Sequence, residues 1–531
     1  MVSTVTDTAN ELKGVSKTNR ENVDFETAIS LTGFGKFNIL LMLVAIPSAW
    51  STVFDTTTMS YVLPSAECDL NLSNFNKGVL NSVVYAGMIS SAFLWGFLSD
   101  TFGRWKLLFA GYFLLATIMI LSSFSQVFWV LTIFKFFGGF IACGPFAILL
   151  TFLAEFNGSH HRARIMMMVG IFTALAIVTL PGLAWLILPQ PWSWTLFNGT
   201  ITFNSWRVFL VVAAIPSLLG GIGICFFDES PKFLMSQGRT EEALKVFRRV
   251  YSINTGNPPE MYPVISLVRE RPRSASILMT AEGDSHKTSF LTLLKQGTKQ
   301  MKPFFFKPHV GKALLVFTIQ FGGLWGMNTI RLWLPQLFAI VEEYILLNER
   351  TSANSTITLC TMLAMRTGGK VVNETVVVED ASCVPVLVGN SMYLYSIIVG
   401  ASTALFNMSA SSIITCVGKK KILVVGYLLS AGCVVAMYWS MNMEMLLVLA
   451  SLFVGSGSMC TNALMSVVDN SCKLDNDDWT NWCSDRKSNF SCISGNQLFS
   501  TILPYWWHHI FMLQFNISTS KNNWKSTGIE F

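Results

Sequence analysis

Long apolar runs alternate with short polar turns along most of this chain. Two such runs, residues 78–98 and 107–124, enclose a charged turn that contains Asp100, Arg104 and Lys106. Each run is about long enough to cross a bilayer as a helix, which takes roughly 20 residues. The turn is predicted to be cytoplasmic, because short cytoplasmic loops carry an excess of Lys and Arg. The pattern therefore predicts an all-α membrane protein that crosses the bilayer several times.

Further apolar runs predict the remaining membrane spans and the orientation of the chain. We expect these spans over residues 37–63, 127–153, 165–188, 208–227, 313–340, 391–417, 422–439 and 445–468. The long polar segment 228–312 is rich in Lys and Arg, whereas the segment 341–389 is acidic and holds few of them. The N-terminus and 228–312 are therefore predicted to be cytoplasmic, and 341–389 is predicted to face the outside or a vesicle lumen.

The order of these segments predicts two helical halves. The expected units are a cytoplasmic tail (1–36), an N-terminal six-helix half (37–227), a cytoplasmic central loop (228–312), a C-terminal half (313–469) that includes the outward loop (341–389), and a divergent tail (470–531). Residues 497–515 could form an eleventh span, but no convincing twelfth span follows. We therefore expect the C-terminal half to be incomplete or divergent.

Composition supports a membrane transporter and argues against other classes. Charged residues make up only 13% of the chain, against about 25% in soluble domains. The net charge of +6 is concentrated in particular loops, which suits orientation signals and not a nucleic-acid partner. The chain has no Cys-x-x-Cys pair, no His/Cys spacing suited to zinc and no Gly-x-x-x-x-Gly-Lys-Ser/Thr loop. We therefore expect no enzyme activity, metal site, cofactor or ATP-driven pump.

Asp55 is the leading candidate for a functional residue inside the membrane. It lies within the first span beside Thr52, Thr56 and Thr57. Ionisable groups in spans are costly and usually face a cavity or a charged partner. Asp55 could bind a proton, a cation or an amine, or it could be a structural charge that pairs with Lys135 of the fourth span. Lys135 could instead extend its amine to the membrane interface.

A second candidate group lies in the outward half of the seventh span. It consists of Asn328, Arg331 and Trp333, and the nearby glycines could let this helix bend and open to a cavity. Arg331 could receive an anionic group, or it could be an anchor at the membrane interface. The sequence alone does not decide between these two interpretations.

The outward loop is expected to carry covalent modifications. It has Asn-x-Ser/Thr acceptor sites at Asn354 and Asn373, and it contains Cys360 and Cys383. An outward, oxidising compartment favours glycosylation of both asparagines and pairing of the two cysteines.

The charged turn resembles a known signature. The pattern Gly96-x-x-x-Asp100-x-x-Gly103-Arg104 is similar to the loop between helices 2 and 3 of the major facilitator superfamily. In that family it acts as a cytoplasmic latch between the two halves of a transporter. Gly96 and Gly103 are expected to allow close approach and sharp turning of the backbone, and Asp100 is expected to accept hydrogen bonds from a helix N-terminus and to pair with Arg104.

Further segments resemble the synaptic vesicle glycoprotein 2 family and its insect relatives, within the organic ion and sugar porter branch. They are residues 60–67, 92–96, 205–209 and 229–234, followed by Gly238-Arg239. The resemblance assigns Glu155 with Arg162, and Glu229 with Arg239, to the cytoplasmic gating motif. It also makes Asp55 the second acid of an acidic pair, with Thr52 at the position of the first acid and Lys135 at the position of an arginine.

This resemblance implies a major facilitator fold of two six-helix halves and a secondary transporter. The expected substrate is a small organic solute, an organic ion or a sugar-like molecule, moved by alternating access with coupling to protons or another ion. The alternative is a non-transporting protein of the same family that acts through binding partners. The expected location is the plasma membrane or an intracellular vesicle.

Overall fold

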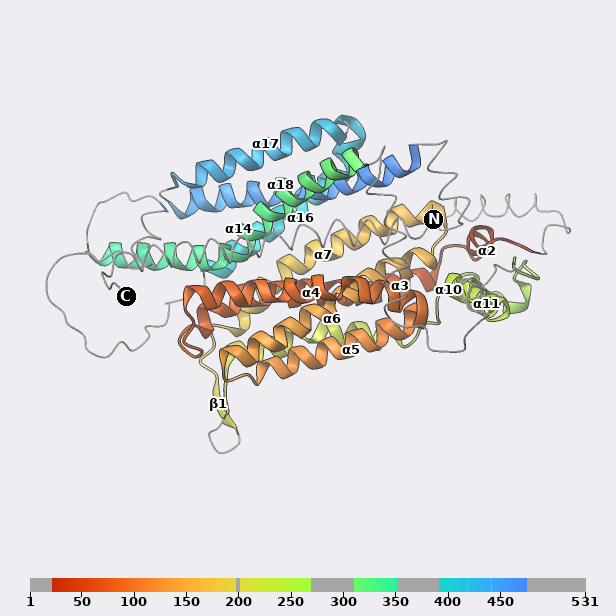
Figure 1. Cartoon of the computed structure of the whole chain (residues 1–531), viewed down its shortest axis with the longest axis horizontal. Coiled ribbons are helices and arrows are strands. Elements are labelled where there is room, and N and C mark those ends of the chain that lie inside the picture. Colours follow the sequence, from red (N-terminus) through yellow and green to blue (C-terminus); the bar gives the residue numbers. More distant parts are fainter. Residues whose placement is uncertain are drawn as a thin grey trace.

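Long helices account for nearly all regular structure in this computed structural model (Figure 1). The structure describes residues 22–196, 201–268, 310–351, 359, 391–417, 419–440 and 442–474. Six helical stretches in this part of the chain are long and apolar enough to cross a membrane: Lys36–Ala66, Arg104–Ser123, Phe128–Glu155, Ser159–Ile187, Ser205–Ile224 and Met443–Thr461. The architecture agrees with the predicted all-α polytopic class.

The N-terminal group of helices is held together by very close backbone packing. Its members are α3 (Lys36–Ala66), α4 (Asn74–Phe102), α5 (Arg104–Ser123), α6 (Phe128–Glu155), α7 (Ser159–Ile187), α8 (Ser205–Ala213) and α9 (Ile215–Ile224). A Cβ added to Gly139 of α6 would overlap the carbonyl oxygen of Val84 in α4. Small residues let membrane helices approach in this way, where dispersion contacts replace the hydrophobic effect as the main attraction.

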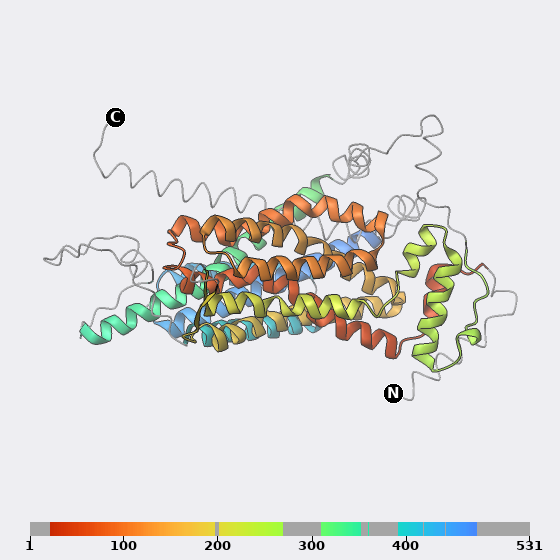
Figure 2. The ribbon, with the colours of Figure 1, turned by 90° about the horizontal axis from the view of Figure 1, so that it is seen from below.

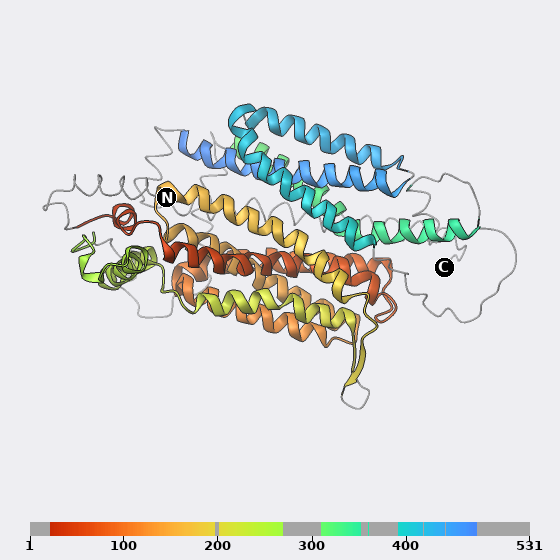
Figure 3. The same ribbon diagram turned by 180° about the vertical axis from the view of Figure 1, so that it is seen from behind.

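The C-terminal group contains α14 (Val310–Thr351), α16 (Ser391–Val417), α17 (Lys419–Met437) and α18 (Met443–Leu474). These helices lie on one side of the molecule and α3 to α6 on the other, with α7 in between (Figures 1 and 3). The two groups meet where α7 packs on α16 and where α14 packs on α3. At the first of these contacts, a Cβ added to Gly400 would lie 3.0 Å from the carbonyl oxygen of Ile177.

Small elements cap the two ends of the N-terminal group. At one end, β1 (Ser193–Leu196) and β2 (Ile201–Asn204) form an antiparallel hairpin. At the other end lie α2 (Phe25–Leu31), α10 (Pro231–Ser236), α11 (Thr240–Thr255) and the short turn η2 (Pro259–Met261) (Figure 2). The predicted boundaries of the units stay predictions, and so does the eleventh span, because residues 497–515 lie outside the described residues.

Candidate functional site

A buried ion pair lies in the N-terminal group of helices. Asp55 comes from the middle of α3 and Lys135 from α6, and the Lys135 Nζ lies 3.3 Å from Asp55 Oδ1. The side chains are 0% and 1% exposed, so Lys135 does not reach an interface. The absence of a side chain at Gly138, one turn along from Lys135, leaves room for the carboxylate: a Cβ there would lie 3.1 Å from Asp55 Oδ1. Such a pair is costly to disrupt, because removing one partner leaves a buried charge unpaired.

Further buried polar atoms lie on α3, close to Asp55 in the sequence, and on the neighbouring helix α4. Several have no hydrogen-bond partner among the described residues: Asp55 Oδ2, Thr52 Oγ1, Thr57 Oγ1, Ser60 Oγ and both amide atoms of Asn81. Buried polar groups are normally satisfied by protein, water or ligand. Such a concentration on neighbouring helices is typical of a wet pathway and not of a lipid-facing surface.

Arg331 extends from α14 toward the N-terminal group of helices. Its charge acts on the hydroxyls of Tyr61 in α3 and Tyr85 in α4, and Tyr85 is also within electrostatic reach of Asp55. Tyr61 and Tyr85 are both buried. Since α14 packs on α3, Arg331 lies on a helix at the contact between the two groups of helices.

The other two candidates on α14 are placed differently. Asn328 is buried, and its amide Nδ2 donates a hydrogen bond to the carbonyl of Leu324 on its own helix, at 3.0 Å. Trp333 is half-buried.

We call Asp55, Lys135, Arg331 and the buried polar residues near them on α3 and α4 the central site. Three of its members were missed by sequence reasoning: Asn81, Tyr61 and Tyr85. Asn81 and Tyr85 are four residues apart on α4 and therefore share one face of that helix. A polar pair at helical spacing inside the apolar run 78–98 was the available signal.

At the end of the N-terminal helices where α2 and α10 lie, Glu229 binds the N-terminus of α5. Its Oε1 accepts hydrogen bonds from the backbone N–H groups of Arg104 at 2.9 Å and Trp105 at 3.1 Å. A carboxylate is favoured there, because the first N–H groups of a helix are unpaired and carry the positive end of the helix dipole. Gly103 has φ of +98°, and a Cβ there would overlap the Glu229 carboxylate. Gly103 therefore both turns the chain and admits the acid.

The Arg104 side chain links three elements at this end. It is buried, its Nη2 lies 3.5 Å from Glu155 Oε1 at the end of α6, and its guanidinium stacks 4.9 Å from the ring centre of Phe233 in α10. The expected Asp100–Arg104 pair involves the Asp100 side chain, which is outside the described part. In the structure, the acid that accepts hydrogen bonds from the N-terminus of α5 is Glu229.

The other residues of the predicted gating motif, Arg162, Arg239 and Gly96, have different surroundings. Arg162 pairs with Glu26 of α2 at 2.9 Å and also donates to the carbonyl of Ala154. Arg239 pairs with Glu242, its neighbour on α11, and both side chains are exposed. The expected close approach at Gly96 is not seen, since no described atom lies within 4 Å of a Cβ added there. Its helix continues to Phe102, so the sharp turn falls at Gly103 alone.

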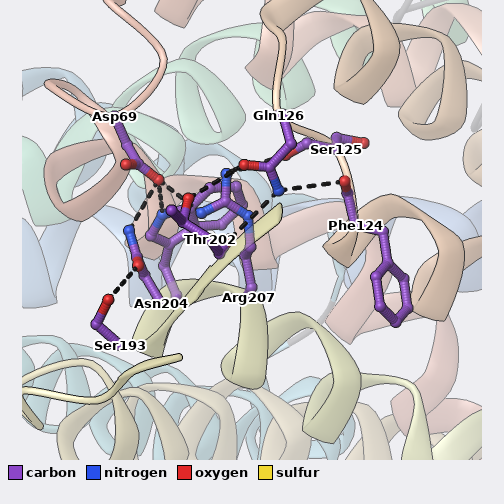
Figure 4. A network of polar contacts seen from close by, with 9 residues as sticks. Asp69, Phe124, Ser125, Gln126, Ser193, Thr202, Asn204 and Arg207 are labelled. Atoms are coloured by element: carbon purple, nitrogen blue, oxygen red, sulfur yellow. Dashed lines mark hydrogen bonds and ion pairs between the residues drawn. The ribbon is translucent and has the colours of Figure 1, made fainter. Parts of the chain in front are cut away.

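A third polar network holds the end of the N-terminal helices that carries the β1–β2 hairpin (Figure 4). Asp69 Oδ2, just after α3, accepts hydrogen bonds from Arg207 Nη1 at 2.7 Å, from Trp206 Nε1 at 2.9 Å and from Asn204 Nδ2 at 3.0 Å. Arg207 is buried and also donates to the carbonyl of Ser125, between α5 and α6.

Cys68, next to Asp69, is disulfide-bonded. Its partner is none of Cys143, Cys225, Cys433 and Cys460, which are free. The predicted glycosylation sites Asn354 and Asn373 and the predicted pair Cys360–Cys383 lie outside the described residues and stay predictions.

Comparisons with known proteins agree with this architecture. Synaptic vesicle glycoprotein 2B of Rattus norvegicus is 27% identical over 327 residues, which cover 60% of this chain and 48% of that protein. Synaptic vesicle glycoprotein 2A of Rattus norvegicus is 31% identical over 244 residues, which cover 45% of this chain and 33% of that protein. The chain thus spans about half the length of the curated relatives it matches, or less.

Solved transporters share the fold at low sequence identity. The xylose transporter XylE from E. coli, in a partially occluded inward-open conformation, has a TM-score of 0.55 at 15% identity, covering 90% of this chain and 99% of that one. The proton:xylose symporter XylE bound to 6-bromo-6-deoxy-D-glucose has a TM-score of 0.56 at 17% identity, covering 92% of this chain and 90% of that one. The family model described as Major Facilitator Superfamily matches residues 45–374, more than half of the chain. This chain is therefore a multi-pass membrane protein that belongs to the Major Facilitator Superfamily.

Proposed function

We propose that the protein is a secondary active transporter that moves a small organic solute across a membrane by alternating access. The observation that carries this proposal is the central site, where Asp55 and Lys135 of one half lie near Tyr85, and Tyr85 interacts with Arg331 of the other half. Ionisable residues inside a membrane protein mark substrate and ion pathways. Transporters of this kind bind their solute near the bilayer midplane, between two halves that rock against each other. The superfamily and the fold are those of transporters and not of enzymes.

Asp55 is proposed as the coupling residue. A carboxylate paired with one buried amine can exchange that partner for a proton or another cation when the helices around it move. Coupling to protons is supported by the fold neighbour XylE, which is named a proton:xylose symporter. In this scheme Lys135 holds the carboxylate in the uncoupled state.

The cytoplasmic residues are proposed to act as a gating group. Glu229, Gly103, Arg104 and Glu155 join α5, α6 and the segment before α10 into one block. Arg162 attaches α2 to the start of α7 through Glu26. We include Gly96, Asp100 and Arg239 in this group because they match the family motif.

Reconstituted uptake tests the proposal. The purified full chain is placed in liposomes, and the uptake of three labelled probes is measured with and without an imposed pH gradient: D-glucose, tetraethylammonium and hippurate. The Asp55→Asn variant is expected to remain inserted and to lose gradient-driven uptake. The matched control is Asp24→Asn, because Asp24 is exposed and its side chain caps no helix.

Two results would contradict this scheme. Uptake by Asp55→Asn that follows the pH gradient as in the parent would make Asp55 a structural residue. A parent protein that moves none of the probes above the level of empty liposomes would favour the alternative, a membrane protein that acts through binding partners.

A further inference from the structure

Buried charges in this protein are paired with opposite charges. Lys77 pairs with Glu67 at 2.6 Å, Arg104 with Glu155 at 3.5 Å, Lys135 with Asp55 at 3.3 Å and Arg207 with Asp69 at 2.7 Å. These pairs include every charged side chain that is buried in the described part of the chain. The pattern is expected, because an unpaired charge away from water costs several kcal/mol, by an order-of-magnitude argument.

Arg331, which is half-buried, lacks the carboxylate partner that the fully buried charges have. Among the described residues no carboxylate forms a salt bridge with it, and its buried Nε has no hydrogen-bond partner. It lies on a helix at the contact between the halves, and its charge acts on the hydroxyls of Tyr61 and Tyr85. With Asp55 neutralised by Lys135, the central site has an excess of one positive charge.

An anionic solute would complete the charge balance of this site. The guanidinium is planar and its N–H groups match the two oxygens of a carboxylate, which makes Arg the usual partner for that group. An organic cation would be repelled by Arg331 and would find Asp55 already paired. A neutral sugar would leave the guanidinium charge without compensation.

The remaining contacts would come from neutral donors nearby. The Tyr85 hydroxyl is within electrostatic reach of Arg331. Asn81 lies one turn away from Tyr85 on the same face of α4. Asn81 is buried, and both atoms of its amide have no partner among the described residues. An amide can donate to a carboxylate or to a polar substituent of the solute.

We propose that Arg331 binds the carboxylate of an organic anion, and that organic carboxylates are the substrate class of this transporter. This inference rests on the proposed transport function. It assigns separate roles to the two charged groups: Arg331 recognises the solute, and the Asp55–Lys135 pair handles coupling.

Binding and uptake of hippurate, an aromatic carboxylate, test this inference separately from transport. Thermal unfolding of the purified full chain is measured with hippurate, with its uncharged amide and with tetraethylammonium. Hippurate alone is expected to raise the unfolding temperature. Arg331→Gln should weaken hippurate binding and uptake by about tenfold or more, since a charge-assisted bond is lost. Arg331→Lys should retain part of the binding, because it keeps the charge but not the bidentate geometry.

A matched control is Arg164→Gln, because Arg164 is an exposed residue near the start of α7. It should bind and transport as the parent does. If the parent takes up glucose or tetraethylammonium and ignores hippurate, the anion proposal is wrong and the transporter proposal stands. If hippurate stabilises the parent through Arg331 but no probe is taken up, the anion site stands and the transporter proposal fails. Equal stabilisation of the parent and Arg331→Gln also overturns the assignment.

Discussion

At the residue scale, the charged side chains that are buried in the described part of the chain each lie beside an opposite charge. The sequence made Asp55, Lys135 and Arg331 visible, because each interrupts an apolar run. It could not show which of them are partners, since pairing depends on how α3, α6 and α14 face one another. Tyr85 was missed for the same reason: a tyrosine in a membrane span is unremarkable until a cation lies beside it.

The buried pair can be tested by removing one charge and then both. Lys135→Met leaves the Asp55 carboxylate buried without its cation, and we expect the free energy of unfolding to fall by about 3–5 kcal/mol. Adding Asp55→Asn should restore most of that loss, because the second charge is then gone. Tryptophan fluorescence during thermal unfolding gives the comparison. Equal instability of the single and double variants would show that Lys135 stabilises the fold by packing and not by charge.

At the element scale, the apolar runs and the helices largely coincide, and the differences have physical reasons. The run 208–227 forms two helices, α8 and α9, because Pro216 lies at the start of the second and has no N–H to donate. The helix α14 continues past the predicted end of its span, from residue 341 to Thr351. Residues such as Glu342 and Glu343 are polar but favour helix, so polarity marked the membrane boundary and not the helix end.

The link between α5 and Glu229 gives a test at this scale. Gly103→Ala places a Cβ where φ is +98° and where the Glu229 carboxylate lies. Both effects are unfavourable, so the variant should lose about 1–3 kcal/mol of stability, measured by thermal unfolding in detergent. Gly170→Ala is the matched control, because no described atom lies within 4 Å of a Cβ added in that part of α7. A loss of the same size in the control would show that the destabilisation comes from helix packing in general and not from the contact with Glu229.

At the scale of the whole molecule, the Asp69–Arg207 network and the Glu229 and Arg104 contacts both lie within the N-terminal half. The Asp69–Arg207 network at one end and the Glu229 and Arg104 contacts at the other tie α3, α5, α6 and α8 into a unit. The contact between the halves is made by packed helices, α7 on α16 and α14 on α3. The overall fold was predictable from span order and the motif around Gly103. The packing between the halves was not, because it depends on small residues such as Gly400, whose role appears only when the opposite helix is known.

Gly400 therefore offers the test of relative movement between the halves. A side chain there would press on the backbone of α7, since a Cβ would already lie 3.0 Å from the Ile177 carbonyl oxygen. Gly400→Leu should favour the conformation in which α7 and α16 are further apart. Overpacking costs about 1–3 kcal/mol, so the conformational equilibrium should shift by a factor of about 5–150. Labelling of single cysteines placed at each end of the central site should then change in opposite directions, with uptake reduced. Gly432→Leu on α17 meets no described atom within 4 Å of its Cβ and should leave both measurements unchanged. If Gly400→Leu labels and transports like the parent, the α7–α16 contact does not govern alternating access.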